Sequence, residues 1–268
     1  MNQTTRETQG LEMYLRALRL PSFVACHGEA ANSAESQGWS YDRYLQHLAE
    51  LELAERERRR TERLLKRSGL SKEKTLGLLD LNRFPVKVRQ RLPTLCDGGF
   101  VERAENVLAF GLPGRGKTHL LCAIGHELIS RRGYQVLFTP TFKLVQRLLV
   151  AKRELALEAE LRRLDRFDAV ILDDIGYIQQ DRDEMDVLFT FLGERYERRS
   201  VMITSNLVFS QWDRIFKDTM TTAAAIDRVV HHSTILELTA KRSYRAEIAK
   251  ERNAEAEKTK SEKTDKSK

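Results

Sequence analysis

A glycine-rich segment that ends in lysine and threonine is the part of the chain best suited to chemistry. Residues 111–118 read Gly-Leu-Pro-Gly-Arg-Gly-Lys-Thr, which is the GxxxxGK[ST] pattern of a phosphate-binding loop. Its glycines permit a turn whose backbone N–H groups converge on phosphate oxygens. Lys117 would reach the β- and γ-phosphates of ATP, and Thr118 would ligate Mg²⁺. The predicted nucleotide-binding residues are Gly111, Leu112, Pro113, Gly114, Arg115, Gly116, Lys117, Thr118 and His119.

The alternative for this segment is a glycine-rich turn that only reverses the chain. An apolar run at residues 107–110 precedes the segment, and a helical pattern at residues 118–130 follows it. A strand before the loop and a helix after it are the context that a phosphate-binding loop needs. The flanking elements therefore favour nucleotide binding.

A pair of carboxylates follows an apolar run at residues 169–172. A nucleotide-bound Mg²⁺ needs a carboxylate at the end of a buried strand, and Asp173 is predicted to supply it. Asp174 could accept a proton from the water that attacks the γ-phosphate, or orient that water. The alternative is that both acids simply begin a solvated turn.

Two further polar residues complete the candidate catalytic set of Lys117, Asp174, Asn206 and Arg228. Asn206 ends an apolar run, where its amide could hold the attacking water or the γ-phosphate, although asparagine is also a common turn residue. Arg228 could neutralise charge on the γ-phosphate of a neighbouring subunit. A surface ion pair of Arg228 with Asp227 or Glu237 is the alternative.

These residues need a scaffold, and the second part of the chain alternates short apolar runs with helical stretches. Such alternation predicts a parallel sheet that is covered by helices on both faces. Strands are expected at residues 106–110, 135–139, 168–173, 201–204 and 234–238, and helices at residues 117–131, 142–164 and 181–198.

A small helical N-terminal domain is expected at residues 1–69, for contact with DNA or a partner. A short helix at residues 11–20 should end at Pro21, and residues 30–38 are rich in small and polar side chains. Ser40 can then cap a long helix that runs to about Arg67.

An arginine stripe marks the second half of this long helix, because its members recur at helical spacing. One interpretation is a surface that contacts the DNA backbone or docks a protein, and the other is a solvated face with Glu52–Arg56 and Glu55–Arg59 pairs. The arginine stripe consists of Arg56, Arg59, Arg60, Arg63 and Arg67.

The remaining organisation follows from composition. Residues 70–105 contain several proline and glycine breakers and are expected to be a linker, residues 106–249 the ATPase domain, and residues 250–268 a disordered charged tail. The 268 residues carry a formal charge of +7, which makes a polyanionic partner plausible. The three cysteines are far apart and predict neither a zinc site nor a disulfide framework. The spread of the cysteines fits a reducing cytoplasm. No apolar signal or membrane segment is visible, so we expect a soluble, cytoplasmic protein with no membrane partner.

The set of motifs resembles the IstB family, ATPase helpers of bacterial insertion-sequence transposition, over most of the chain. It is also similar to DnaC helicase loaders and more distantly to DnaA initiators. Besides the motifs above, the segments that carry the resemblance are Leu15-Arg16-Ala17-Leu18-Arg19-Leu20-Pro21, Gly125-His126-Glu127-Leu128, Arg195-Tyr196-Glu197-Arg198-Arg199-Ser200, Thr204-Ser205-Asn206-Leu207, Phe209-Ser210-Gln211-Trp212, Asp227-Arg228-Val229-Val230-His231-His232-Ser233 and Ser243-Tyr244-Arg245.

The resemblance implies an α/β fold of the P-loop AAA+ class, a three-layer sandwich with a parallel five-stranded sheet and no sizeable C-terminal lid. It places Lys117 and Thr118 on Walker A, Asp173 and Asp174 on Walker B, Asn206 on sensor 1 and Arg228 on the arginine finger. The implied protein is a homo-oligomer with ATP and Mg²⁺ between subunits, which assembles on duplex DNA and recruits a partner transposase.

Two departures and two alternatives accompany the resemblance. Many relatives have glutamate where this chain has the shorter Asp174, which implies slow hydrolysis, and no sensor 2 arginine is evident. A DnaC-like loader of a replicative helicase would have the same fold. A small-molecule kinase or GTPase is disfavoured, because the sequence lacks an Asn-Lys-x-Asp element.

Overall fold

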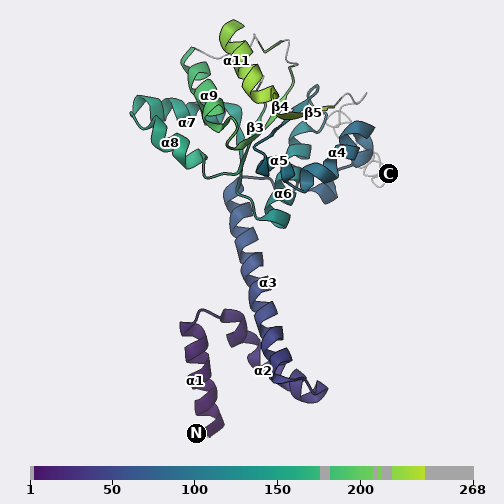
Figure 1. Ribbon diagram of the computed structural model, residues 1–268, viewed down its shortest axis with the longest axis vertical. Helices are drawn as coiled ribbons and strands as arrows, with labels where there is room; N and C mark the ends of the chain where they lie inside the picture. Colours follow the sequence, from purple (N-terminus) through teal and green to yellow (C-terminus); the bar gives the residue numbers. More distant parts are fainter. Residues whose placement is uncertain (1–2, 176–181, 208–210, 213–218, 239–268) are drawn as a thin grey trace, which may run out of the picture. The chain divides into compact units, whose positions relative to one another are not determined.

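The computed structural model describes residues 3–175, 182–207, 211–212 and 219–238. The chain divides into two compact units, Met1–Arg63 and Leu64–Lys268. The first unit contains helices only, and the second contains a sheet with its covering helices (Figure 1). Each unit has its own packing.

The second unit is built on a five-stranded sheet in the order β2-β3-β4-β1-β5. Every pair of neighbouring strands is parallel. Strand β4 lies between β1 and β3, so the segments that follow these three strands leave the same edge of the sheet side by side. The strands are β1 (Asn106–Phe110), β2 (Val136–Pro140), β3 (Ala169–Asp173), β4 (Ser200–Ser205) and β5 (Ser233–Glu237).

Helices cover both faces of this sheet, which confirms the predicted three-layer α/β sandwich. Successive strand residues point to opposite faces. Val107 and Ala109 belong to a core cluster that includes one face and α6, whereas Leu108 and Phe110 belong to a second cluster that includes α7 and α9. Figure 1 shows α6 and α9 on different sides of the strands. The helices of these layers are α6 (Lys117–Arg132), α7 (Thr141–Arg153), α8 (Leu157–Leu164), α9 (Arg182–Arg195) and α11 (Thr219–Val230).

The helix expected at residues 142–164 is wrong as a single element. The chain forms α7 and α8 instead, and Leu155 between them has a φ of 55°, in the left-handed region that interrupts a helix. Helix α9 also stops at Arg195, earlier than expected, and Glu197 in the following turn has a φ of 57°. Side-chain periodicity alone does not reveal such backbone reversals.

Residues 70–105, expected to be a linker, instead form part of the core of the second unit. They form η1 (Leu76–Leu78), η2 (Leu81–Arg83), α4 (Val86–Cys96) and α5 (Gly99–Glu102). The linker prediction fails because proline and glycine here bound short helices whose apolar faces are buried against α6. The buried apolar residues of this segment are Leu70, Phe84, Val88, Leu92, Leu95, Cys96, Phe100 and Val101.

The N-terminal unit consists of α1 (Gln3–Ala17), α2 (Pro21–Gln37) and most of α3 (Tyr41–Ser68). Pro21 begins α2 and does not merely end the preceding helix, as its fixed φ allows at the first helical position. The small residues at 30–38 continue α2 as far as Gln37. Ser40 caps α3 as predicted, because its Oγ accepts the N–H of Arg43 at 3.2 Å.

Glu52 of α3 joins two helices of the N-terminal unit. Its carboxylate is buried and accepts the N–H of Ser22 at 2.8 Å, in the first turn of α2, and the Nε of Arg56 at 2.8 Å. Burial raises the pKa of Glu52, but the hydrogen bonds from Ser22 and Arg56 outweigh it and hold the pKa below its usual value. The ionised carboxylate therefore stabilises the start of α2.

Several predictions concern parts of the chain outside the described residues. The charged tail at residues 250–268 and the absence of a C-terminal lid both belong to this group. Within the described residues, none of the helices combines the length and the apolar character that crossing a lipid bilayer requires. Cys26, Cys96 and Cys122 form no disulfide.

Candidate nucleotide-binding site

The glycine-rich segment forms the turn between β1 and α6. Gly116 has a φ of 84° and Gly111 a φ of 153°, conformations that other residues rarely adopt. A Cβ atom at Gly116 would lie 3.0 Å from Cζ of Phe84, and one at Gly111 would lie 2.7 Å from the carbonyl oxygen of Leu238. Glycine is therefore required at both positions, because a side chain there would collide with Leu238 or Phe84.

The start of α6 presents the donors that a triphosphate needs. The first helical hydrogen bond runs from the N–H of Leu120 to the carbonyl of Gly116 at 2.8 Å, so the N–H groups of residues 118 and 119 have no acceptor within the helix. Lys117 is buried, and its Nζ donates to the carbonyl oxygens of Gly111 at 2.6 Å and Leu112 at 3.1 Å. The ammonium group thus lies across the loop, and these donors fit an anionic phosphate chain.

The side chains of His119 and Arg115, two other residues of the predicted nucleotide site, differ in their contacts. Nε2 of His119 lies 3.1 Å from the carbonyl oxygen of Thr75, so its imidazole contacts the segment that precedes the sheet. The Nη1 atom of Arg115 is buried without a hydrogen-bond partner among the described residues.

A hydrogen-bonded network joins the loop to the carboxyl ends of β3 and β4. Oδ1 of Asp173 accepts the hydroxyl of Thr118 at 2.7 Å and the hydroxyl of Thr204 at 2.8 Å. The Thr204 oxygen in turn accepts the N–H of Asp174 at 2.8 Å. A hydroxyl beside a carboxylate is the oxygen pair with which Mg²⁺ is held next to a triphosphate, so Thr118 and Asp173 fit that ion.

Asp174 and Asn206 lie at the two ends of this network. Asp174 has a φ of 62°, and its N–H is fixed by the Thr204 hydroxyl, so the direction of its side chain is set by an uncommon backbone conformation. Oδ1 of Asn206 is buried and has no hydrogen-bond partner among the described residues. A buried amide oxygen of this kind needs a donor, such as a water molecule.

The structure places Lys117, Thr118, Asp173, Asp174 and Asn206 at one edge of the sheet. The reason is the strand order, since the loop after β1, the acids after β3 and the amide after β4 leave adjacent strands. Sequence reasoning assigned no role to two residues at this edge. Thr204 joins Asp173 to Asp174, and its polar side chain near the end of a strand could have indicated this role. Phe84 packs against Gly116, and no local sequence pattern indicates that contact.

Arg228 of α11 does not join this group in its own chain. Its guanidinium lies over the ring of Phe189, 4.5 Å from the centroid, and close against Gly193 of α9. The carbonyl of the next residue, Val229, accepts the side-chain N–H of Asn106 at 3.1 Å, at the start of β1. The phosphate-binding loop follows the far end of β1, about 13 Å away for a five-residue strand.

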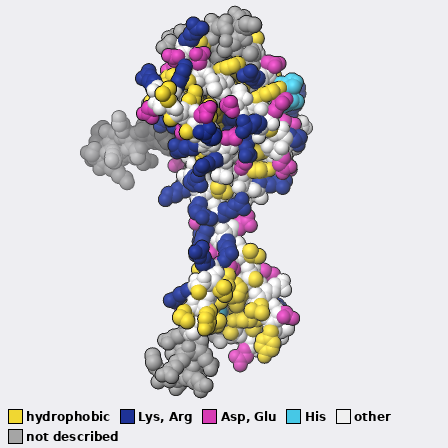
Figure 2. All heavy atoms as spheres, turned by 60° about the vertical axis from the view of Figure 1, so that its left-hand side comes forward, with side chains coloured by type: hydrophobic (Ala, Val, Ile, Leu, Met, Phe, Trp, Pro, Cys, Tyr) yellow, Lys and Arg dark blue, Asp and Glu magenta, His cyan; other side chains and the backbone are white. Residues whose placement is uncertain are grey.

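The arginine stripe lies exposed along α3, and Figure 2 shows Lys and Arg side chains gathered along this helix. Two of its members make the ion pairs of the solvated-face interpretation, Arg56 with Glu52 at 2.8 Å and Arg59 with Glu55 at 2.5 Å. Nε of Arg63 donates to the backbone carbonyl of Arg59 at 3.3 Å. Part of the stripe is therefore engaged within α3.

Comparison with solved structures supports the fold. DnaI aligns with a TM-score of 0.52 at 22% identity, over 62% of this chain and 90% of the other. A replication initiator DnaA bound to AMPPCP and single-stranded DNA aligns with a TM-score of 0.54 at 18% identity, over 70% of this chain and 56% of the other. At these identities the likeness concerns the AAA+ fold.

Proteins related in sequence identify the family of this chain. A protein of Sinorhizobium fredii named as an insertion sequence ATP-binding protein is 44% identical over 242 residues, 90% of this chain and 80% of the relative. The insertion sequence IS21 ATP-binding protein of Pseudomonas aeruginosa is 36% identical over 85% of this chain and 86% of the relative. The model of the IstB-like ATP binding protein family matches residues 13–252. With its phosphate-binding loop and acidic pair in place, the chain belongs to the IstB-like ATP-binding family.

Proposed function

We propose that this protein is an ATP-hydrolysing switch that assembles on duplex DNA and assists a partner transposase in insertion-sequence transposition. The observation that carries the proposal is the network of Thr118, Asp173, Thr204 and Asp174 beside the phosphate-binding loop, with Arg228 apart from it. The names of the relatives supply the transposition context.

In this proposal the loop N–H groups and Lys117 bind the β- and γ-phosphates of ATP. Thr118 and Asp173 hold Mg²⁺, which supplies positive charge to neutralise the phosphate oxygens. Asp174 accepts the proton of the attacking water, and Oδ1 of Asn206 accepts a hydrogen bond from the same water. Each subunit offers these groups at one edge of its sheet.

The remaining positive charge comes from a second subunit. Arg228 packs on α9 of its own chain, so we propose that it reaches the γ-phosphate of a neighbour and makes hydrolysis depend on assembly. ATP between subunits then holds the oligomer on DNA, and hydrolysis releases it. The assembly marks the DNA on which the transposase acts.

DNA binding tests this proposal most directly. Fluorescence anisotropy of labelled duplex and single-stranded DNA would be measured with ATP, with ADP and without nucleotide, using the full chain and Lys117→Ala. We expect tight duplex binding only for the wild-type chain with ATP. Equal affinity for duplex DNA with ATP, with ADP and without nucleotide would contradict the proposal. Tighter binding to single-stranded DNA than to duplex DNA would favour a helicase loader.

Thr204→Val is expected to reduce Mg²⁺-dependent ATP turnover by about 10 to 100 fold, the usual effect of removing a residue that orients a metal ligand. Valine has nearly the same shape, but it removes the donor to Asp173 and the acceptor for the Asp174 N–H. Turnover would be measured against Mg²⁺ concentration, with Thr204→Ser as the control that keeps the hydroxyl. Equal turnover in the valine and serine variants would contradict this role.

The arginine stripe is tested by its effect on salt dependence. Replacing Arg60, Arg63 and Arg67 together with glutamine keeps the Glu52–Arg56 and Glu55–Arg59 pairs. If all three contact phosphates, the slope of log affinity for duplex DNA against log salt should fall by about 3. A control triple variant of the exposed Arg153, Arg162 and Arg163 removes the same charge elsewhere. If the salt slope fell equally in the two triple variants, the arginine stripe would have no specific role in DNA binding.

A further inference from the structure

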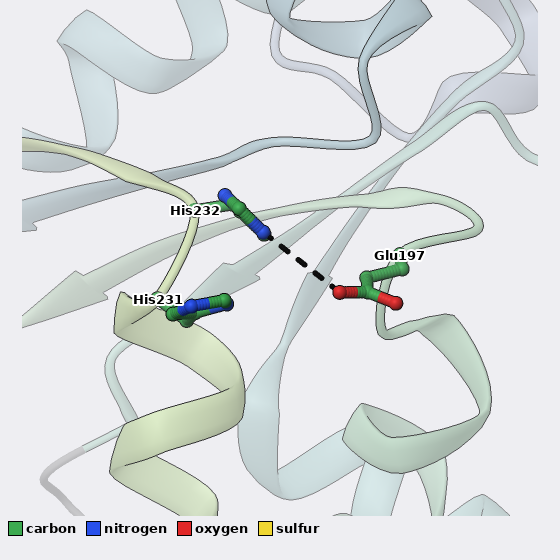
Figure 3. Close-up of side chains that lie close together, drawn as sticks. All are labelled: Glu197, His231 and His232. Carbon is green, nitrogen blue, oxygen red and sulfur yellow. Dashed lines mark ion pairs between the residues drawn. The ribbon is translucent and has the colours of Figure 1, made fainter.

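Two histidines and a glutamate gather at the sheet edge opposite to the phosphate-binding loop. Glu197 lies in the turn before β4, and His231 and His232 lie between α11 and β5 (Figure 3). Each residue offers one ligand atom, and the three atoms lie within 4.8 Å of one another. Nε2 of His232 lies 3.8 Å from Oε1 of Glu197. None of these side chains belongs to the nucleotide site.

The backbone on both sides of this cluster is fixed. The carbonyl of His232 accepts the N–H of Asn106 at 2.7 Å, and the N–H of His231 donates to the carbonyl of Asp227 at 2.9 Å. On the other side, the N–H of Arg199 donates to the carbonyl of Arg195 at 2.9 Å. Strands β4 and β5 both flank β1, so the two turns that precede them are held near each other.

A tyrosine hydroxyl orients one of the histidines. Oη of Tyr196 lies 3.1 Å from Nδ1 of His231, which leaves Nε2 of that ring for a ligand. A hydrogen bond to the second ring nitrogen is the usual arrangement around a metal-bound histidine.

The two imidazole rings lie next to each other, and each offers one nitrogen atom as a ligand. Their centroids are 4.1 Å apart. The carboxylate of Glu197 lies beside them, and Glu105 is a second carboxylate near His232. Arg103 neutralises Glu105 through its own ion pair at 2.7 Å, so Glu197 is the carboxylate available to a cation.

We propose that Glu197, His231 and His232 bind a divalent transition-metal ion of the Zn²⁺ or Co²⁺ type. Two imidazole nitrogens and one carboxylate oxygen are ligands that such ions prefer, whereas Mg²⁺ and Ca²⁺ prefer oxygen alone. Tetrahedral Zn²⁺ needs ligand atoms about 3.3 Å apart. The three side chains are exposed and can rotate to close the remaining distance. The ion would tie the turn after α9 to the end of α11, and its fourth position stays open to water.

Cobalt titration tests the site on the full-length, tag-free chain after treatment with a chelator. Saturating Mg²⁺ and ADP are included, so that the oxygen ligands around Asp173 are occupied. We expect one Co²⁺ per chain and the intense visible absorption band of tetrahedral cobalt with nitrogen ligands. Zn²⁺ should displace the cobalt and raise the melting temperature of the protein.

Variants separate this site from nonspecific binding. His231→Ala with His232→Ala should abolish the band, Glu197→Gln should weaken affinity, and Tyr196→Phe should weaken it by about 10 fold while keeping the band. His126→Ala is the matched control, because its ring contacts the carbonyl of Ser71 instead. No tetrahedral band in the wild-type chain, or a band that survives in the folded double variant, would overturn the proposal. Circular dichroism confirms folding of each variant.

Discussion

Arg228→Ala is expected to lower ATP turnover by about 10³ fold or more, which is the scale on which an arginine finger acts. The guanidinium of Arg228 packs on Phe189 and Gly193 of its own chain, near the start of β1, while the phosphate-binding loop follows the end of that strand. We therefore propose that the side chain acts on a nucleotide held by another subunit. Nucleotide affinity of the isolated chain should stay nearly unchanged, and assembly on DNA should weaken.

A mixing experiment distinguishes this role from a loss of packing. Arg228→Ala keeps an intact loop, and Lys117→Ala keeps an intact arginine, so a mixture of the two inactive variants should recover turnover at mixed interfaces. Arg228→Lys keeps the charge but not the planar fork of donors, and it should stay well below wild type. A mixture that stays inactive although both variants assemble, or wild-type turnover in Arg228→Ala alone, would contradict action between subunits.

The phosphate-binding loop and the strands were predictable from sequence because they are local. Continuous apolar runs indicate strands buried on both faces, and the loop pattern is confined to eight residues. The acids and Asn206 were predictable for the same reason, since each directly follows such a run. The strand order, which no local sequence pattern shows, then brings them together.

Non-local packing explains what the sequence did not reveal. Residues 70–105 contain breakers that resemble a linker, yet Leu92 and Phe100 are buried in the core of the second unit. Their short helices are stable only against α6, and no periodicity within a four-residue helix such as α5 can show this. Leu155 follows α7 and Glu197 follows α9, and both have a left-handed backbone. Because neither residue is glycine, the sequence did not indicate these turns.

For Asp173 and Asp174, the sequence predicted some features of the site, and only the structure revealed others. Sequence reasoning assigned the metal to Asp173 and the water to Asp174, and the structure places the Asp173 carboxylate against Thr118. The sequence could not show that Asp174 has a left-handed backbone, or that Thr204 holds its N–H. These two features set where the Asp174 carboxylate points, and they make its substitution informative.

Asp174→Asn is expected to lower the turnover number for ATP by about 10² to 10⁴ fold, the contribution of a general base, while nucleotide affinity changes little. Asparagine has nearly the same shape and tolerates the left-handed region, so the backbone at φ 62° and the hydrogen bond from the N–H to Thr204 should persist. Single-turnover hydrolysis and binding of a fluorescent ATP analogue measure the two quantities separately. Wild-type hydrolysis in this variant would remove Asp174 from the reaction.

The Asp174→Glu variant tests whether the short side chain of Asp174 limits the rate of ATP hydrolysis. The added methylene carries the carboxylate closer to the attacking water, so faster turnover than wild type is expected if the length of the side chain governs hydrolysis. Glutamate costs about 1 kcal/mol more than aspartate in a left-handed conformation, an effect that appears as lower thermal stability and not as lower turnover. A stable variant that hydrolyses ATP no faster than wild type would show that the geometry set by Thr204, and not the side-chain length, controls the rate.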